Sequence, residues 1–320
     1  MNRLTYFGLS CCLLVGCAGG SIPLGSIGSS LTGFNIGDSE LDAFRSIGRA
    51  SEKIGPQEEY YIGRAVAANI LYKYPVSRNG NLQRYVNKVG QSLVAFSDRP
   101  ETYGGYHFAV VQSPEINAVA APGGYIFITD SFLKQLRSED ELAAVLAHEV
   151  GHVVEEHGVS AISQAHLTNA FMKVGSIAAD QSLSGTMVGT VGSPLVEAFQ
   201  GSVDDVLETL LVNGYGRSQE YDADEYGVQL LAKAGYDPNA FVSVLKTLER
   251  LEKESTQGGW LSTHPKGEDR LDELDDLPRS RSTDLGLAAR TRRFSAATGI
   301  RVASLLLQLG NVFHFERAQS

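Results

Sequence analysis

The chain has 320 residues, 43% of them hydrophobic and 20% charged, which is ordinary for a globular protein with one large domain or two small ones. Its formal net charge of -10 argues against a general nucleic-acid-binding protein. The charge is uneven, because the segment 279–320 carries seven arginines and only two acidic residues. All three cysteines lie within the first 17 residues, so the rest of the chain contains neither a disulfide nor a thiol metal ligand.

The first residues have the pattern of a secretory signal. Residues 1–16 combine a basic start at Arg3 with an apolar run of about a dozen residues, which is too short to span a membrane. The ending LVGC resembles the bacterial lipobox, which implies that Cys17 becomes the lipidated first residue and anchors the protein at a membrane. Ala18 favours the outer membrane, facing the periplasm, by resemblance to enterobacterial sorting. The alternative is an ordinary cleaved signal with a chance cysteine, which would leave a soluble periplasmic or secreted protein.

Beyond the signal, residues 17–40 are dominated by Gly, Ser and isolated apolar residues, which predicts a flexible tether. Apolar periodicity and turn signals then predict an α+β domain, mainly helical, with a small β-sheet. The expected elements are helices over Glu58–Tyr74 and Asn81–Phe96, strands over Tyr106–Val111, Ile116–Ala121 and Tyr125–Thr129, a helix from Ser138 to about Gly158, and helices over Asp204–Asn213, Ser218–Ala234 and Pro238–Glu254. Ser138 and Glu141 form a capping box at the start of the middle helix.

This middle helix contains the sequence HEVGH. His148, Glu149 and His152 spell H-E-x-x-H, the pattern of two zinc ligands and a general base. At 3.6 residues per turn the two histidines lie on one face, about 6 Å apart along the axis, so both imidazoles can reach one ion. Glu149 lies about 100° around the helix, beside the ion, where a base can hold a water molecule. The alternative interpretation is a pair of helix histidines whose hydrogen bonds are satisfied without a metal.

A catalytic zinc takes three protein ligands and keeps one position open for water. Glu156 shares the histidine face but lies about 12 Å along the axis from His148, and His157 points away from that face. We therefore interpret residues 155–157 as the solvated end of the helix and expect the third ligand from another helix.

The best candidate for the third ligand lies in RSQEYDADEYG. Glu220 and Asp224 are spaced four residues apart on one helical face, so Glu220 can bind the metal while Asp224 accepts a hydrogen bond from a ligand histidine. By itself E-x-x-x-D is a common pattern, and a solvated surface charge is the alternative interpretation of either residue.

HEVGH followed by E-x-x-A-D resembles the HtpX-like and CAAX-prenyl-protease superfamily of gluzincin zinc metallopeptidases. Two further segments match that family in the same order. INAVAAPGGYIFIT precedes the helix that carries HEVGH, which we call the metal helix, and STHP is followed by Arg270 five residues after its proline. The matching region runs from about Glu58 to Leu274. Since no segment after the signal reaches the roughly 18 apolar residues of a membrane span, the chain is more similar to the soluble, lipid-anchored bacterial branch implicated in envelope protein quality control.

The resemblance implies a zincin-like minigluzincin domain over residues 41–278, followed by a basic tail at 279–320. It also implies one Zn²⁺ per chain, held by His148, His152 and Glu220, with Glu149 as the general base. His264 is the donor to the developing oxyanion that the family suggests, with Arg270 fixing the local structure. Alternatives remain open here, because a His-Pro pair is often a simple turn and Tyr221 or Tyr226 could donate instead.

An extended peptide substrate needs a free strand edge near the zinc. The family match suggests that Asn117, Ala118, Gly124 and Tyr125 bind substrate, if the segment from Asn117 to Thr129 forms an edge strand. The alternative is an internal strand, for which YIFIT is sufficiently apolar.

Two function classes follow from these patterns. The first is a zinc endopeptidase that cleaves misfolded or unassembled envelope proteins, and the second is a chaperone-like module that binds such clients with little turnover. Glu149 favours the enzyme, because a binding module needs no base beside the metal. Residues 175–193 could form a lid or a plain connector, and the basic tail could dock on the acidic body, contact anionic lipid or cap the cleft. No oligomeric state is predicted.

Overall fold

The computed structural model describes residues 54–162, 200–254, 263–264, 267–275 and 286–300 of the chain. The predicted signal, the tether and residues 175–193 lie outside these ranges. In chain order the described elements are α3 (Pro56–Lys73), α4 (Gly80–Val94), β1 (His107–Val111), β2 (Ala118–Ala121), the 3-10 turn η3 (Pro122–Gly124), β3 (Tyr125–Thr129), α5 (Asp130–Leu133), α6 (Glu139–Val154), α7 (His157–Ser160), the π-helical turn η4 (Thr209–Asn213), α10 (Arg217–Lys233), α11 (Asn239–Glu254), α13 (Gly267–Asp275) and α14 (Leu287–Thr298).

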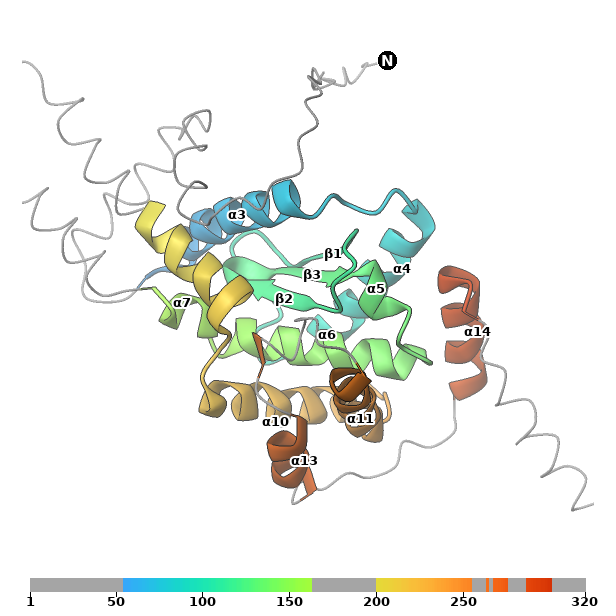
Figure 1. Ribbon diagram of the computed structural model, residues 1–320. Coiled ribbons are helices and arrows are strands. Elements are labelled where there is room, and N and C mark those ends of the chain that lie inside the picture. Colours follow the sequence, from blue (N-terminus) through green and yellow to red (C-terminus); the bar gives the residue numbers. More distant parts are fainter. Residues whose placement is uncertain (1–53, 163–199, 255–262, 265–266, 276–285, 301–320) are drawn as a thin grey trace, which may run out of the picture. The chain divides into compact units, whose positions relative to one another are not determined.

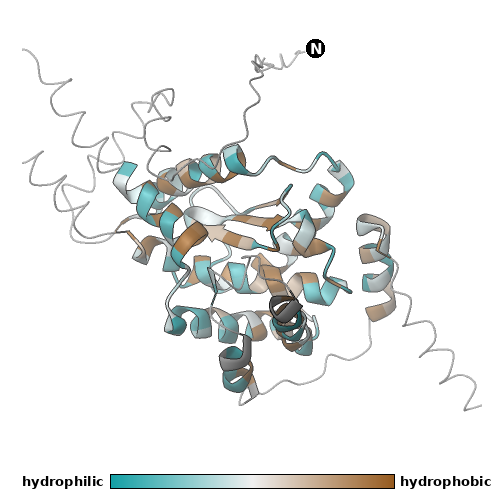
Figure 2. Cartoon of the chain, viewed as in Figure 1, coloured by the Kyte–Doolittle hydropathy of each residue, from teal (hydrophilic) through white to brown (hydrophobic). Residues whose placement is uncertain are grey.

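The described strands form one three-stranded sheet with the order β1-β3-β2. β3 pairs in parallel with β1 and antiparallel with β2, so β3 is internal and β2 lies at an edge. Helix α3 contacts the sheet from one side, whereas α4 and α6 pack on the other side (Figure 1). Strands β2 and β3, which contact α6, are strongly apolar (Figure 2), and every residue of β2 is buried.

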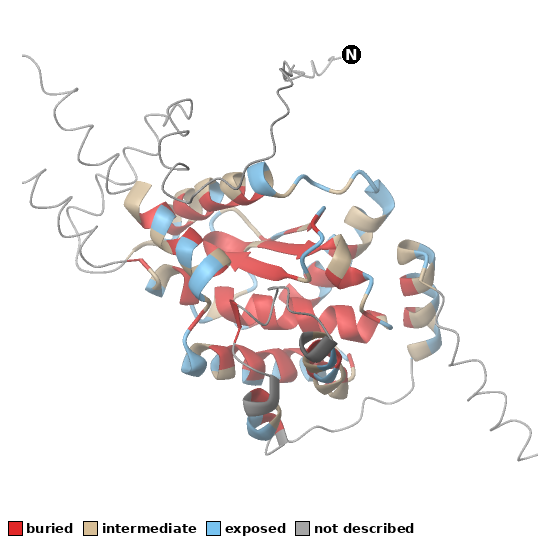
Figure 3. Cartoon of the chain, in the orientation of Figure 1, coloured by how far each residue is buried: buried red, intermediate tan, exposed pale blue. Residues whose placement is uncertain are grey.

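Helix α6 is a core helix that lies between the sheet and α10. Its side chains are buried from Glu139 to Val153, as its nearly uniform colour in Figure 3 shows. Ser138 caps its start, because the Ser138 side chain accepts a hydrogen bond from the Glu141 N–H at 3.0 Å. The Glu141 carboxylate, however, accepts from the Arg137 N–H at 2.7 Å, one residue earlier than a capping box requires.

The metal helix ends earlier than predicted. α6 ends at Val154 and not near Gly158, because Glu156 adopts a left-handed conformation with φ of 55° before α7 begins. The Arg99 guanidinium stabilises this end, since it donates a hydrogen bond to the Val153 carbonyl at 3.1 Å and pairs with Glu156 at 3.5 Å. The chain therefore turns back toward the core at His157.

Helices α6 and α10 approach each other closely at two glycines. A Cβ atom on Gly151 would lie 3.1 Å from the Ala223 Cα, and one on Gly227 would lie 3.2 Å from the His148 backbone nitrogen. Larger side chains at these positions would push the two helices apart. The close approach brings the histidine face of α6 against the acidic face of α10.

Part of the basic tail belongs to the folded domain. Helix α14 packs against α4 and α6, and its Phe294 side chain is completely buried. Its Arg290 donates to Asp140 and its Arg293 donates to Glu139, both in the first turn of α6. Within the described residues, no helix is both long enough and apolar enough to cross a membrane.

Candidate active site

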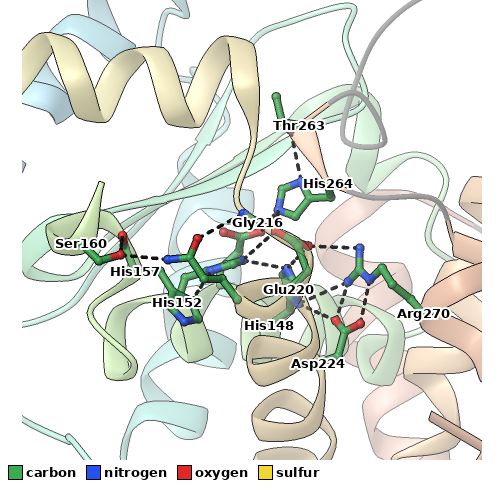
Figure 4. A network of polar contacts seen from close by, with 12 residues as sticks. His148, His152, His157, Ser160, Gly216, Glu220, Asp224, Thr263, His264 and Arg270 are labelled. Atoms are coloured by element: carbon green, nitrogen blue, oxygen red, sulfur yellow. Dashed lines mark hydrogen bonds and ion pairs between the residues drawn. The ribbon is translucent and has the colours of Figure 1, made fainter. Parts of the chain in front are cut away.

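Four side chains from three parts of the chain converge on one point. His148 and His152 project from one face of α6, Glu220 projects from α10, and His264 follows in the loop before α13 (Figure 4). The Nε2 atoms of His148 and His152 are 3.0 Å apart, and the Glu220 carboxylate lies 3.7 Å from the first and 3.6 Å from the second. His264 Nε2 lies 3.8 Å from the same carboxylate. All four candidate ligand atoms lie within 4.8 Å of one another.

The donor set suits zinc. Two ligand atoms on a tetrahedral zinc, each bound at about 2.0–2.1 Å, are separated by roughly 3.3 Å, which is close to the spacings among these nitrogens and oxygens. Both oxygens of the completely buried Glu220 carboxylate make no hydrogen bond to the described residues, and the Arg270 guanidinium lies no nearer than 3.5 Å, so lone pairs remain that a metal ion could take.

Burial also keeps the two helix histidines neutral, as metal ligands must be. It lowers the pKa of His148 to about 4, although the hydrogen bond to Asp224 acts in the opposite direction. Burial and the neighbouring imidazoles lower the pKa of His152 well below its ordinary value. The pKa of Glu220 is raised well above its ordinary value by burial, with Arg270 opposing the shift.

Asp224 and Arg270 hold His148 from behind. The Asp224 carboxylate lies 2.9 Å from His148 Nδ1, so the imidazole Nε2 is directed toward Glu220. Arg270 Nε donates to the same carboxylate at 2.7 Å, and the Arg270 Nη1 lies 3.5 Å from Glu220. Burial alone would raise the pKa of Asp224, but Arg270 and His148 together hold it below its ordinary range. Arg270 thus contacts two carboxylates of the site directly, which is a more specific role than fixing the local structure.

Glu149 faces a narrow pocket beside the cluster. The Glu149 side chain is buried, and its Oε1 lies 4.0 Å from His264 Nε2. The pocket lies between the edge strand β2 and η4 and is lined by Val119, Ala120, Glu149, Thr209, Leu210, Gly214, Tyr215, Thr263 and His264. The predicted base and the predicted oxyanion donor therefore border the same space.

The four predicted substrate-binding residues separate into two pairs. Asn117 and Ala118 lie at the start of the edge strand, where Asn117 exchanges hydrogen bonds with Thr129 and Ala118 pairs with Ile128. Gly124 and Tyr125 lie in η3 and on the internal strand β3, where Tyr125 is paired with a strand on each side. The residues of β2 that line the pocket beside Glu149 are instead Val119 and Ala120.

Of the two tyrosines considered as alternative donors, Tyr226 is bound elsewhere, and a tyrosine that was not predicted lies at the site. The Tyr226 hydroxyl accepts a hydrogen bond from the Asp98 N–H at 2.8 Å and is thereby committed elsewhere. Tyr215 instead stacks on the His152 ring, with centroids 4.2 Å apart, and lines the pocket beside Glu149. Its buried hydroxyl makes no hydrogen bond within the described part of the chain. The sequence signal was an aromatic residue between two glycines, shortly before the helix that carries Glu220.

His157 also contradicts the sequence interpretation. Glu155 and Glu156 are exposed, as expected of a solvated helix end, but the His157 side chain is only 5% exposed. Its Nδ1 lies 2.9 Å from the Nδ1 of His152. The prediction failed because it continued α6 through residue 157, whereas the left-handed turn at Glu156 redirects the chain.

A small sheet packed on a buried H-E-x-x-H helix, with a glutamate supplied by a later helix, defines the zincin-like fold of a metallopeptidase domain. A comparison with protein-family models agrees with this class, because the model of Peptidase family M48 matches residues 80–277. The chain belongs to peptidase family M48.

Several relatives match about two thirds of the chain. The chain is 27% identical over 217 residues to the beta-barrel assembly-enhancing protease of Escherichia coli K12, covering 67% of this chain and 42% of that protein. It is 28% identical over 225 residues to the protein of that name from Yersinia pestis, covering 69% and 44%. It is 30% identical over 202 residues to the mitochondrial metalloendopeptidase OMA1 of Schizosaccharomyces pombe, covering 61% and 53%. The chain thus spans about half the length of these curated relatives.

Proposed function

We propose that the protein is a zinc-dependent endopeptidase that hydrolyses peptide bonds of misfolded or unassembled cell-envelope proteins. The observation that carries the proposal is the convergence of the two Nε2 atoms of α6 on the buried Glu220 carboxylate. Glu149 lies 4.0 Å from the His264 Nε2 that approaches the same carboxylate. Membership of a peptidase family supports the reaction class.

In this proposal His148, His152 and Glu220 hold one zinc ion per chain. When bound, zinc supplies Lewis-acid chemistry, since it acidifies a water molecule and polarises the scissile carbonyl. Glu149 removes the proton of the attacking water and delivers it to the leaving amine. His264 donates a hydrogen bond to the oxyanion that develops on the substrate. The His264 ring nitrogen also lies within 4.8 Å of the other candidate ligand atoms, so in the absence of substrate His264 could help to hold the ion.

The substrate peptide would extend along the outer edge of β2. The edge position of β2 and the pocket formed with Val119, Ala120 and Glu149 support this placement. Because backbone hydrogen bonds along an edge place little demand on side chains, we expect broad sequence preference. η4 contacts β2, so we expect peptide binding along β2 to require η4 to move away from the strand.

The proposed clients are proteins of the bacterial envelope, with outer-membrane proteins among them. Relatives named beta-barrel assembly-enhancing protease support this location and client class. We further propose that lipidation of Cys17 anchors the protein to the outer membrane, with the domain facing the periplasm. The LVGC sequence supports the anchor.

The decisive experiment compares the full-length protein with Glu149→Gln and Glu220→Ala. Wild type should bind about one zinc per chain and degrade unfolded casein. Glu149→Gln should retain zinc and lose nearly all turnover, because the base is gone while the three ligands remain. Glu220→Ala should lose most of its zinc, as measured by metal analysis after dialysis.

The same experiment separates the peptidase from a chaperone-like module. The peptidase proposal would be contradicted if wild type showed no turnover of casein and Glu149→Gln suppressed client aggregation as well as wild type does. Full zinc content in Glu220→Ala would show that the third ligand is misassigned.

A further inference from the structure

The two helix histidines of the site are oriented by different chemical groups. His148 has the usual arrangement, because its Nδ1 lies 2.9 Å from the carboxylate of Asp224. For His152, the partner of Nδ1 among the described residues is an imidazole, the Nδ1 of His157 at 2.9 Å. The two rings meet edge to face, with centroids 5.1 Å apart and an interplanar angle of 67°.

The direction of the hydrogen bond follows from the position of the ligand atom. His152 presents Nε2 to His148 and Glu220, so this nitrogen must keep a lone pair for the metal and the ring proton must reside on Nδ1. His152 Nδ1–H then donates, and His157 Nδ1 accepts. A neutral His157 meets this requirement when its own proton resides on Nε2.

The surroundings hold His157 where it can accept this bond. It opens α7 directly after the left-handed turn at Glu156 and is buried. The Ser160 hydroxyl donates to the His157 carbonyl at 2.7 Å, and Gln219 on α10 donates to Ser160 at 2.8 Å. These contacts tie α7 to α10 and place the imidazole against His152, as Figure 4 shows.

Tyr215 completes the enclosure of His152. Its ring stacks on the His152 imidazole at 4.2 Å with an interplanar angle of 22°, which restrains tilting of the imidazole. Stacking does not restrain rotation of the ring within its own plane or select a tautomer. A hydrogen bond to Nδ1 restrains both.

We infer that His157 is a positioning residue for the metal site, which accepts the Nδ1–H of His152 and thereby fixes the tautomer and rotation that direct Nε2 to the metal. The inference rests on the proposed ligation by His152. His157 does not touch the substrate or the metal, and it acts through His152 alone.

The test measures zinc affinity of the full-length protein by competition with a chromophoric chelator, together with the visible spectrum of the Co²⁺ form. His157→Leu removes the acceptor while keeping a buried side chain, and should weaken zinc binding about 10- to 100-fold and change the cobalt bands. His157→Asn places its amide oxygen near the position of Nδ1 and should stay close to wild type in both measurements. His157→Gln places its oxygen farther out, near the position of Nε2, and should behave like His157→Leu.

Ser160→Ala is the matched control, since it removes both anchoring hydrogen bonds of α7 and leaves the imidazole intact. It should weaken zinc binding much less than His157→Leu does, because the turn at Glu156 and the burial of His157 still hold the imidazole. Wild-type affinity and spectrum in His157→Leu would overturn the inference, as would a loss in His157→Asn equal to that in His157→Leu. A loss in Ser160→Ala as large as in His157→Leu would assign the effect to docking of α7.

Far-ultraviolet circular dichroism of the metal-free protein shows whether His157→Leu folds. If it does not, the comparison of His157→Asn with His157→Gln replaces it as the test. Equal zinc affinities of these two variants would overturn the inference. A wild type that binds no zinc contradicts the proposed function itself. If wild type binds zinc normally and the substitutions at His157 leave zinc affinity unchanged, only the positioning role is contradicted.

Discussion

At the scale of single residues, the loop that carries His264 depends on a glycine from another part of the chain. Gly214 adopts a φ of 74°, a backbone conformation that residues other than glycine adopt only with strain. A Cβ atom at this position would also lie 1.9 Å from the Thr263 carbonyl oxygen. Gly214 therefore permits Thr263, and with it His264, to approach His148, His152 and Glu220.

We predict that Gly214→Ala lowers catalytic turnover strongly while zinc is retained, because the displaced residue is His264 and not one of the three proposed ligands. Its free energy of unfolding should fall by the roughly 1–3 kcal/mol of a non-glycine residue held at φ 74° and ψ 175°, plus a further roughly 1–3 kcal/mol for the collision. Urea denaturation, casein turnover and metal analysis measure the three quantities.

Gly235→Ala is the control for backbone strain alone. Gly235 has φ of 78°, but a Cβ atom there would meet no heavy atom within 4 Å. This variant should lose only the roughly 1–2 kcal/mol of strain and keep full turnover. Equal stability and activity losses in the two variants would contradict the role assigned to the contact with Thr263.

At the scale of elements, the start of the metal helix depends on α14. The first turn of α6 contains Glu139, Asp140 and Glu141, which suit the positive end of the helix dipole but are buried. Buried carboxylates need partners, and α14 supplies Arg290 to Asp140 and Arg293 to Glu139. Helix α14 therefore stabilises the element that carries both histidines.

We predict that Arg290→Ala lowers the free energy of unfolding by about 3 kcal/mol, because it leaves the Asp140 carboxylate buried without its cation. Arg292→Ala, an exposed arginine on the same helix, should change it by less than about 0.5 kcal/mol. Urea denaturation of both variants checks this. Similar stabilities of the two would show that α14 does not hold α6 through this pair.

At the scale of the whole molecule, the folded domain extends beyond the matched family region. The family model ends at residue 277, whereas α14 at Leu287–Thr298 buries Phe294 and pairs with the metal helix. A protein shortened to the matched region would expose this contact surface of α4 and α6.

The proposed membrane attachment also belongs to this scale. We predict that Cys17→Ala abolishes incorporation of radioactive palmitate in bacterial cells and moves the protein from the membrane fraction to the soluble fraction, because the acceptor of the lipid is lost. Cys12→Ala, which alters another cysteine of the signal, should still be labelled. Labelling of Cys17→Ala equal to that of wild type would contradict the anchor.

Much of the fold and the site was predictable, because the signals are local. All three strands were expected within two residues of their observed ends, and α10 and α11 within one residue. Helical spacing alone predicted that His148 and His152 share a face, and it paired Glu220 with Asp224. α13 and α14 were not predicted, because their short amphipathic patterns resemble those of a charged surface segment.

By itself, then, the sequence determined which side chains could serve as metal ligands and base, since helix periodicity and residue chemistry are properties of short segments. Only the tertiary structure decided that His157 returns to contact His152, that Tyr215 stacks on it, that β2 rather than β3 is the edge strand, and that α14 neutralises the start of α6. The physical reason is that each of these depends on backbone turns and contacts between residues far apart in the chain. The left-handed residue at Glu156 directs His157 toward His152, and it leaves no local pattern in the sequence.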